Sequence, residues 1–193
     1  MKESINSTES AKVTADKNQI RQKIRELKEQ LSQAQKQKEA DLVFHRVELL
    51  PEFQEAKTIL VYWSNSDELP THAFIEKWSC EKEILLPSIQ DDDITPKRFH
   101  LSRKMRKGLL GIWEPDTTEN FTGAIDLVIV PGIAYDIKKN RLGRGKGYYD
   151  RFLEQIETVK WGVGFDFQLL PSIPTYQNDI SMDKIITATH IIA

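Results

Sequence analysis

The segment AIDLVIVPG (residues 124–132) is apolar on both faces when its chain is extended. Strands of this kind are typical of the middle of a sheet that helices cover on both sides. We therefore expect residues 124–132 to form the central strand of such a sheet. The rest of the chain should supply its neighbours.

Four other segments have the length and apolar character of strands: TILVYW (58–63), EILLPSI (83–89), WGVGFDF (161–167) and DKIITATHII (183–192). Helices are expected at 17–45, at 71–80 and from Tyr148 onward. The first helix carries an apolar stripe at helical spacing: Ile20, Ile24, Leu27 and Leu31. This alternation predicts an α/β fold, with an open, mostly parallel sheet and helices on both faces. Ligands of such sheets bind past the carboxyl ends of the strands.

Composition and charge narrow the class of protein. The 193 residues suffice for a single domain, which we expect at 17–193 behind a disordered polar tail at 1–16.

No apolar run approaches the roughly 20 residues that cross a bilayer, and no signal or transit peptide is recognisable. The single cysteine, Cys80, excludes an internal disulfide and fits a reducing compartment. Because the net charge is −2, broad affinity for nucleic acid is not expected. We expect a cytoplasmic monomer with neither a nucleic-acid nor a membrane partner.

The segment DIKKNRLGRGKGYYDR (136–151) concentrates positive charge on a glycine-rich loop. It has six basic and two acidic side chains in a protein of net charge −2. Glycines at alternate positions let backbone amides approach an anion. The glycines are Gly143, Gly145 and Gly147, and the basic residues before and between them are Arg141, Arg144 and Lys146. The spacing matches neither a Walker A loop nor the dinucleotide fingerprint. The loop nevertheless predicts a phosphate site.

Acidic residues near this loop are candidate magnesium ligands. Asp150 lies in the first turn of the helix expected after the loop, and a second carboxylate could come from Asp179 or Asp183. Mg²⁺ is usually held by one or two carboxylates together with phosphate oxygens and water. A zinc site is not expected, because the histidines are widely spaced and the cysteine is solitary.

Aromatic residues beside the loop suggest a second ligand. Tyr148, Tyr149 and Trp63 could stack on a flat heterocycle, or they could be ordinary packing aromatics. Glu68 could pair with an amino-pyrimidine edge. A phosphate chain held next to a heterocycle suits phosphoryl transfer, in which positioning and charge neutralisation provide the catalysis.

The run VPGIAYDIKKNRLGRGKGYYDRFL (130–153) resembles the signature of 5-formyltetrahydrofolate cyclo-ligases, also called 5,10-methenyltetrahydrofolate synthetases. Four other segments resemble this family in the same order: KNQIR (17–21), SDELPT (66–71), GIWEP (111–115) and NDISMDKIIT (178–187). The resemblance covers residues 17–187. It implies a sheet similar to those of sugar-phosphate isomerases and CoA transferases, and an ATP- and Mg²⁺-dependent ring closure of 5-formyltetrahydrofolate.

The resemblance also implies a role for each candidate residue. Arg144 and Lys146 would be catalytic. The ATP site would consist of Lys17, Arg21, Arg141, Gly143, Arg144, Gly145, Lys146, Gly147, Tyr148 and Tyr149. The folate site would consist of Trp63, Glu68, Tyr148 and Tyr149. The metal ligands would be Asp150 and Asp179, with Asp183 ranked behind them.

Two other functions compete with this interpretation. A non-catalytic protein could use the basic loop to hold nucleotide or RNA, and it would show salt-dependent binding without ATP turnover. A sugar-phosphate isomerase or CoA transferase with a similar sheet would need no ATP. The uninterrupted RLGRGKGYYD favours the cyclo-ligase over both.

Overall fold

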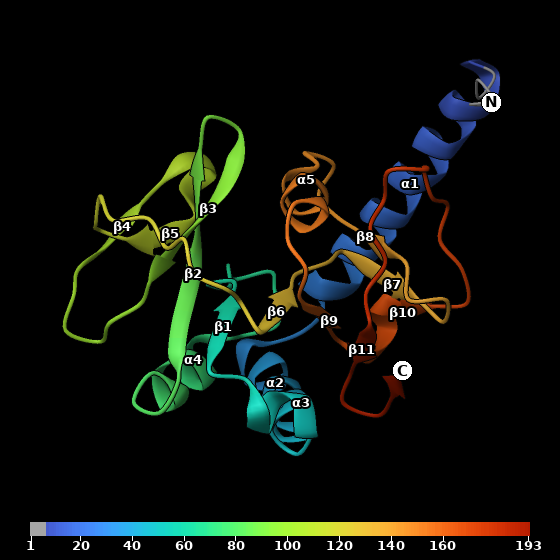
Figure 1. The fold of residues 1–193 in the computed structure, drawn as a ribbon. Helices are drawn as coiled ribbons and strands as arrows, with labels where there is room; N and C mark the ends of the chain where they lie inside the picture. The colour runs from blue at the N-terminus through green and yellow to red at the C-terminus, as the bar shows by residue number, and fades with distance from the viewer. Residues whose placement is uncertain (1–6) are drawn as a thin grey trace.

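A seven-stranded sheet with the strand order β12-β11-β9-β6-β1-β2-β3 forms the centre of the computed structural model, which describes residues 7–193 (Figure 1). Its strands are β1 (Thr58–Val61), β2 (Glu83–Gln90), β3 (Asp93–Arg98), β6 (Leu127–Val130), β9 (Val159–Val163), β11 (Lys184–Ile186) and β12 (Ile191–Ile192). The five inner strands are parallel, and the edge strands β3 and β12 pair antiparallel with their neighbours. The prediction of an open, mostly parallel sheet is confirmed.

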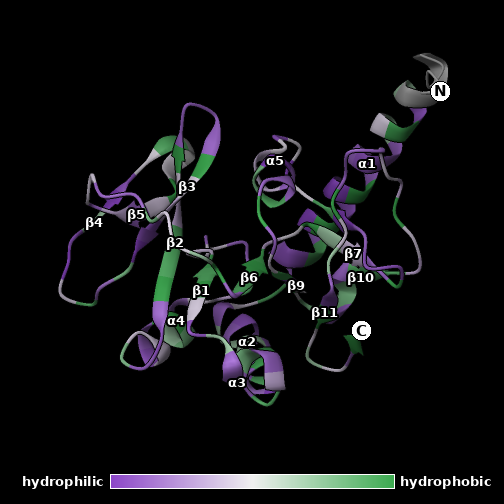
Figure 2. Ribbon diagram, in the orientation of Figure 1, coloured by the Kyte–Doolittle hydropathy of each residue, from purple (hydrophilic) through white to green (hydrophobic). Residues whose placement is uncertain are grey.

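Strand β6 is the middle strand, as its sequence predicts, and all four of its residues are buried. Successive residues of a strand point to opposite faces. Leu127 and Ile129 therefore join one hydrophobic cluster, while Val128 and Val130 join another on the other side of the sheet. Figure 2 shows β6 and much of β2 in hydrophobic colours. An apolar run without alternation is the pattern that this double burial requires.

Helices cover both faces of the sheet. The α-helices of residues 7–193 are α1 (Ser7–Glu29), α2 (Gln33–Glu48), α3 (Pro51–Glu55), α4 (His72–Trp78) and α5 (Tyr148–Glu154), of which α2 to α5 pack on the sheet. Phe44 of α2, Phe53 of α3 and Phe74 of α4 pack in the cluster on one face, whereas Phe152 and Leu153 of α5 pack in the cluster on the other (Figure 1). The predicted placement of helices on both faces is confirmed.

Two smaller sheets and two single-turn helices complete the fold. One small sheet has the order β10-β7-β8, with β10 (Leu169–Leu170), β7 (Ala134–Asp136) and β8 (Arg141–Leu142); the other pairs β4 (Met105–Lys107) with β5 (Trp113–Pro115). The 3-10 helices are Leu109–Gly111 and Asp166–Gln168. The apolar stripe of α1 packs against the first small sheet, where Ile24 is buried with Ala134 and Leu142. This contact places α1 next to the glycine-rich segment that follows β8.

The prediction of one helix over 17–45 is wrong, because this part of the chain forms two helices. Helix α1 ends at Glu29, and α2 begins at Gln33 behind a capping box. The Ser32 side chain accepts from the Gln35 N–H at 3.3 Å, and the Gln35 side chain accepts from the Ser32 N–H at 2.9 Å. This reciprocal pair satisfies amides that the start of a helix leaves unpaired, so it fixes a new start there.

The expectation that residues 1–16 are disordered is also wrong for residues 7–16. These residues are helical, since α1 begins at Ser7. Thr14 gives part of the reason: its hydroxyl lies 2.5 Å from the hydroxyl of Tyr176. This contact with the C-terminal part of the chain gives the first turns of α1 a tertiary partner. Residues 1–6 lie outside the described part of the chain.

Candidate active site

A cavity of about 670 Å³ opens past the carboxyl ends of β1 and β6. Tyr62 and Trp63, which follow β1, line it, as do Pro131 to Ile133, which follow β6. With the exception of Asp183, every residue to which the sequence assigned a role lines this cavity: Lys17, Arg21, Trp63, Glu68, Arg141, Gly143, Arg144, Gly145, Lys146, Gly147, Tyr148, Tyr149, Asp150 and Asp179. The structure thus brings together residues from both ends of the chain. Their individual roles stay predictions.

The glycine-rich loop joins β8 to α5 and needs glycine at two positions. Gly145 has φ of +95° and Gly147 has φ of +70°, a region that other residues enter only with strain. Guanidinium groups crowd this backbone: a Cβ added to Gly145 would lie 3.3 Å from Nη2 of Arg21. A Cβ added to Gly143 would lie 2.9 Å from Nη1 of Arg141. The alternate glycines therefore let a turn and two arginines occupy the same small space.

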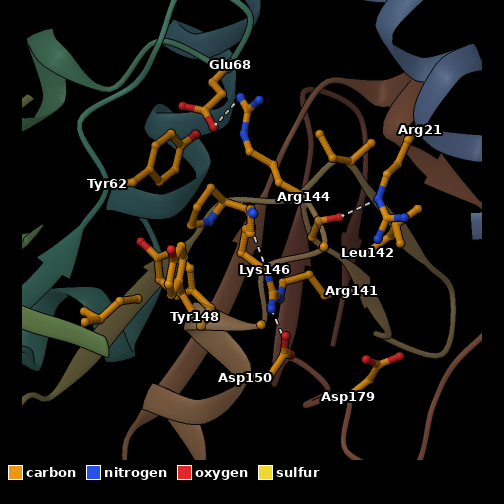
Figure 3. Close-up of a pocket in the computed structure, with 18 of the residues that line it drawn as sticks. Arg21, Tyr62, Glu68, Arg141, Leu142, Arg144, Lys146, Tyr148, Asp150 and Asp179 are labelled. Carbon is orange, nitrogen blue, oxygen red and sulfur yellow. Dashed lines mark hydrogen bonds and ion pairs between the residues drawn. The ribbon is translucent and has the colours of Figure 1, made fainter. Parts of the chain in front are cut away.

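Three basic side chains stand beside the loop, two of them from α1. Arg21 donates from Nε to the carbonyl of Gly143 at 3.0 Å (Figure 3). The Lys17 ammonium lies 2.5 Å from Oδ2 of Asp179. Lys17 and Arg141 are both almost fully buried. Buried cations of this kind require an anionic partner.

One nitrogen of the Arg141 guanidinium has no hydrogen-bond acceptor in the described part of the chain. Its Nη2 donates to Oδ1 of Asp150 at 2.8 Å, and its Nη1 donates to the carbonyl of Pro131 at 3.3 Å. Its Nε is buried, and no partner for it occurs within residues 7–193. A buried N–H without an acceptor is costly, so this atom marks a place where the oxygen of a ligand would be stabilised.

The two acidic residues that were predicted to bind metal belong to segments that contact each other. Oδ1 of Asp150 accepts from the backbone N–H of Ile180, the residue after Asp179, at 3.3 Å. Oδ2 of Asp179 accepts from the N–H of Tyr176 at 2.7 Å. Asp183 lies elsewhere, since its Oδ2 accepts from the N–H of Lys160 at 2.7 Å and it does not line the cavity.

This donor set fits magnesium held largely by phosphate. Residues 7–193 contain no group of three or more histidine, cysteine, aspartate or glutamate side chains that could hold a metal by themselves. Asp150 and Asp179 offer two carboxylates beside a cationic loop. Mg²⁺ typically takes one or two carboxylates and completes its octahedron with phosphate oxygens and water.

Arg144 reaches across the cavity to the turn between β1 and α4. Its Nη2 lies 2.9 Å from Oδ1 of Asp67 and 3.0 Å from Oε1 of Glu68. Lys146, two residues later, has an exposed side chain that lies between Tyr62 and Arg141 in Figure 3. The loop therefore directs one cation to the turn between β1 and α4 and leaves another exposed in the lining of the cavity.

Aromatic and apolar side chains also line the cavity. Trp63 stacks on His72 with ring centroids 4.1 Å apart. Tyr148 donates to Oδ1 of Asp92 at 3.3 Å. The hydroxyl of Tyr149 is buried without a partner in the described part of the chain, and burial raises the pKa of this group well above its ordinary value. Further apolar side chains of the lining are Pro87, Ile89, Ile94 and Ile112.

Several residues of the site escaped the sequence analysis. Asn18 accepts from Nη1 of Arg21 at 2.8 Å, a contact that the spacing of three residues on a helix could have suggested. Tyr176 lies under the Lys17 ammonium, with 4.1 Å between nitrogen and ring centroid. No local pattern points to Tyr176 or to Asp67, because both act through contacts with distant parts of the chain.

Comparison with known proteins assigns the family. A sequence model of the 5-formyltetrahydrofolate cyclo-ligase family matches residues 13–188. The chain belongs to this family. The resemblance seen in the glycine-rich segment is thereby confirmed, and the protein is an enzyme of the cyclo-ligase family.

Individual cyclo-ligases match over most of their length. The chain is 30% identical to the 5-formyltetrahydrofolate cyclo-ligase of Haemophilus influenzae over 184 residues, which cover 90% of this chain and 98% of that protein. It is 28% identical to the probable 5-formyltetrahydrofolate cyclo-ligase of Caenorhabditis elegans over 188 residues, which cover 88% of this chain and 91% of the relative.

Solved structures of two such enzymes share the fold. The NMR structure of Aquifex aeolicus 5,10-methenyltetrahydrofolate synthetase superposes with a TM-score of 0.82 at 31% identity, over 91% of each chain. The 5,10-methenyltetrahydrofolate synthetase from Mycoplasma pneumoniae superposes with a TM-score of 0.72 at 24% identity, over 90% of this chain and 99% of that one. At that lower identity the likeness concerns the fold alone. Within residues 7–193, no helix has both the length and the apolar character of a membrane span.

Proposed function

We propose that the protein converts 5-formyltetrahydrofolate to 5,10-methenyltetrahydrofolate and cleaves ATP to ADP and phosphate, with Mg²⁺ present. Family membership supports this reaction. The observation that carries it is the composition of the cavity, which combines a loop of cations with aromatic and apolar side chains. A phosphate chain and a flat heterocycle would lie side by side in such a space.

In the proposed reaction, the oxygen of the N5-formyl group attacks the γ-phosphorus of ATP, and the bond to ADP breaks. The formyl group is now an N5-iminium phosphate. Its carbon accepts the lone pair of N10. A bond from N10 to this carbon forms, the carbon–oxygen bond breaks, and inorganic phosphate leaves with the formyl oxygen. N10 loses its proton, so atoms and charge balance.

The cations of the site would bind the phosphates and offset the charge that develops during transfer. Arg141, Arg144 and Lys146 supply guanidinium and ammonium donors, and Lys17 and Arg21 add two more from α1. Preorganised donors of this kind are often the largest single contribution to catalysis. Arg144 and Lys146 are the residues that we assign to the transferring phosphoryl group.

Asp150 and Asp179 would hold Mg²⁺, which supplies charge neutralisation for the phosphates when it is bound. Arg141 orients Asp150 through the 2.8 Å ion pair, and Lys17 orients Asp179 through the 2.5 Å ion pair. Each carboxylate therefore approaches the cavity with one oxygen already engaged by a cation.

The folate would occupy the aromatic part of the cavity. Glu68 is almost buried, with 12% of its side chain exposed, and its Oε2 accepts from the N–H of Asn65 at 2.9 Å. A carboxylate held in this way is suited to an amino-pyrimidine edge. Trp63, Tyr148 and Tyr149 would stack on or border the ring system.

An absorbance assay tests the overall reaction. Purified protein, 5-formyltetrahydrofolate, Mg²⁺ and ATP should produce the near-ultraviolet absorbance of the methenyl product, and omission of ATP should abolish it. Formation of product without ATP would contradict the proposal. Retained ATP binding with no product would favour the non-catalytic nucleotide binder instead.

An isotope experiment tests the phosphorylated intermediate. Substrate that carries ¹⁸O in the formyl group should deliver this oxygen to inorganic phosphate, because the formyl carbon–oxygen bond breaks after phosphorylation. Unlabelled phosphate at full conversion would show that ATP is hydrolysed by water. Action as a monomer stays a separate prediction, which sedimentation velocity tests.

A further inference from the structure

We propose that Asp67 is a positioning residue that restrains Arg144 and thereby limits the affinity of the cavity for a phosphate chain. The inference rests on the proposed function, in which Arg144 binds the phosphates of ATP. Nothing in the sequence distinguishes Asp67 from a solvated acid in a turn.

Asp67 binds the Arg144 guanidinium but does not line the cavity itself. Nη2 of Arg144 lies 2.9 Å from both Oδ1 and Oδ2 of Asp67, and 3.0 Å from Oε1 of Glu68. Arg144 and Glu68 line the cavity, whereas Asp67 does not. Figure 3 shows the Arg144 side chain extended toward Glu68 and away from Arg141 and Asp150. The acids of the turn thus draw Arg144 away from the other cations.

A guanidinium between two carboxylates contributes little to the attraction of another anion, because its charge is already compensated. Partial burial disfavours the charged form of Asp67, but Arg144 and Lys28 hold the pKa of this carboxyl below its usual value. Asp67 is therefore ionised at neutral pH and competes with a phosphate for Arg144.

The backbone around Arg144 permits the exchange. Gly143 and Gly145 flank the residue, and Gly145 already has φ of +95°. Glycine crosses between backbone regions without the steric barrier that a Cβ imposes. Arg144 can thus turn from the β1–α4 turn to a ligand while Arg21 keeps its 3.0 Å hydrogen bond to the Gly143 carbonyl.

Two lysines keep the turn in place when Arg144 leaves. Lys36 donates from Nζ to the carbonyl of Ser66 at 2.9 Å. Lys28 is almost fully buried, which lowers its pKa, and the charges of Asp67 and Glu68 oppose this lowering. The acids therefore retain a nearby counter-charge. Loss of Arg144 to a ligand does not leave them uncompensated.

The test is ATP binding with Mg²⁺ and without folate, measured by calorimetry. Asp67→Asn keeps the size of the side chain and removes its charge. We expect its dissociation constant for ATP to fall about two- to fivefold, the range that corresponds to release of one exposed ion pair. In turnover, KM for ATP should fall by a similar factor while kcat stays within about twofold. An unchanged or weaker affinity would overturn the inference.

A double-mutant cycle separates restraint of Arg144 from simple repulsion of phosphate. If Asp67 acts through Arg144, then Asp67→Asn has no effect on ATP affinity in an Arg144→Ala background. An equal gain in both backgrounds means that Asp67 only repels the ligand, and this result rejects the positioning role.

Two control variants test whether any gain in ATP affinity comes from the charge at position 67 rather than from substitution of any exposed acid. Asp67→Glu preserves the charge and should bind ATP like the wild type. Asp116→Asn removes an acid of similar exposure, 51% against 46%, that interacts with Arg106 rather than with Arg144. It should leave affinity unchanged. Equal thermal midpoints for Asp67→Asn and the wild type would exclude a general loosening of the turn.

The outcomes also separate this inference from the proposed reaction. A wild type that binds ATP but forms no methenyl product rejects the reaction, while the binding experiment still decides the role of Asp67. A wild type that forms product, with no gain in Asp67→Asn, rejects the role of Asp67 alone. A wild type that does not bind ATP rejects both.

Discussion

Lys17 of α1 and Asp179 form an ion pair of 2.5 Å, although 162 residues separate them in the sequence. Lys17 is buried, and 21% of the Asp179 side chain is exposed. The ring of Tyr176 covers the same ammonium. This pair closes one side of the cavity and fixes a carboxylate whose own segment has little regular structure.

Lys17→Met should raise KM for ATP about tenfold or more, because a hydrogen bond to a charged group contributes roughly 1.5–3 kcal/mol and Asp179 also loses its counter-charge. Lys17→Arg should recover part of the affinity. Lys12→Met changes an exposed lysine of the same helix and should have no effect. Equal KM values for Lys17→Met and the wild type would show that Lys17 does not contribute to nucleotide binding.

Lys146→Ala should lower kcat by about 10²-fold or more, since removal of one preorganised donor to developing charge typically costs roughly 10²–10³. Lys138→Ala, which removes an exposed lysine before the loop, serves as the matched control. Steady-state kinetics with both substrates saturating provides the measurement. A near-normal kcat would mean that the loop only tethers the nucleotide.

Asp150→Asn should raise the Mg²⁺ concentration for half-maximal activity about tenfold or more, because even indirect partners of metal ligands change metal affinity by roughly 10–100-fold. Asparagine still accepts a hydrogen bond from Arg141, so the fold should persist. Asp183→Asn should leave the magnesium titration unchanged, because Asp183 does not line the cavity. The opposite pattern would exchange the roles of these two acids.

His72 should make the folded protein less stable in mild acid. Burial lowers its pKa below the ordinary 6.5. The unfolded chain therefore binds a proton at a pH where the folded protein does not, so stability is complete above about 6.5 and falls as pH decreases toward the folded pKa. His72→Gln should lose less thermal stability than the wild type between pH 7.5 and 5.5, whereas exposed His45→Gln should behave like the wild type. Parallel curves for His72→Gln and the wild type would contradict this assignment.

The parts of the fold that sequence predicts are those set by local pattern. The double-sided apolar character of 124–132 identifies the central strand, and glycines between arginines identify the loop. The break at Ser32 was missed because its capping box lies within a continuous helix-forming sequence. The helical residues 7–16 were missed because their polar composition says nothing of the distant contact between Thr14 and Tyr176.

The site divides in the same way. The residues of the loop follow from their own sequence, whereas Lys17 and Arg21 gained a role only through the family resemblance, since a cationic helix face is usually solvated. Asp67 received no role at all. Its effect depends on Arg144, 77 residues later in the chain, and short-range patterns carry no information about such a pair.

The position of β1 between β2 and β6 has a consequence for synthesis. On the ribosome, β1, β2 and β3 emerge first and can pair with one another, but β6 is made much later. Until then one edge of β1 presents unpaired amides and carbonyls to other nascent chains. A polypeptide interrupted before Leu127 should therefore aggregate, and this window is where a chaperone would be needed most.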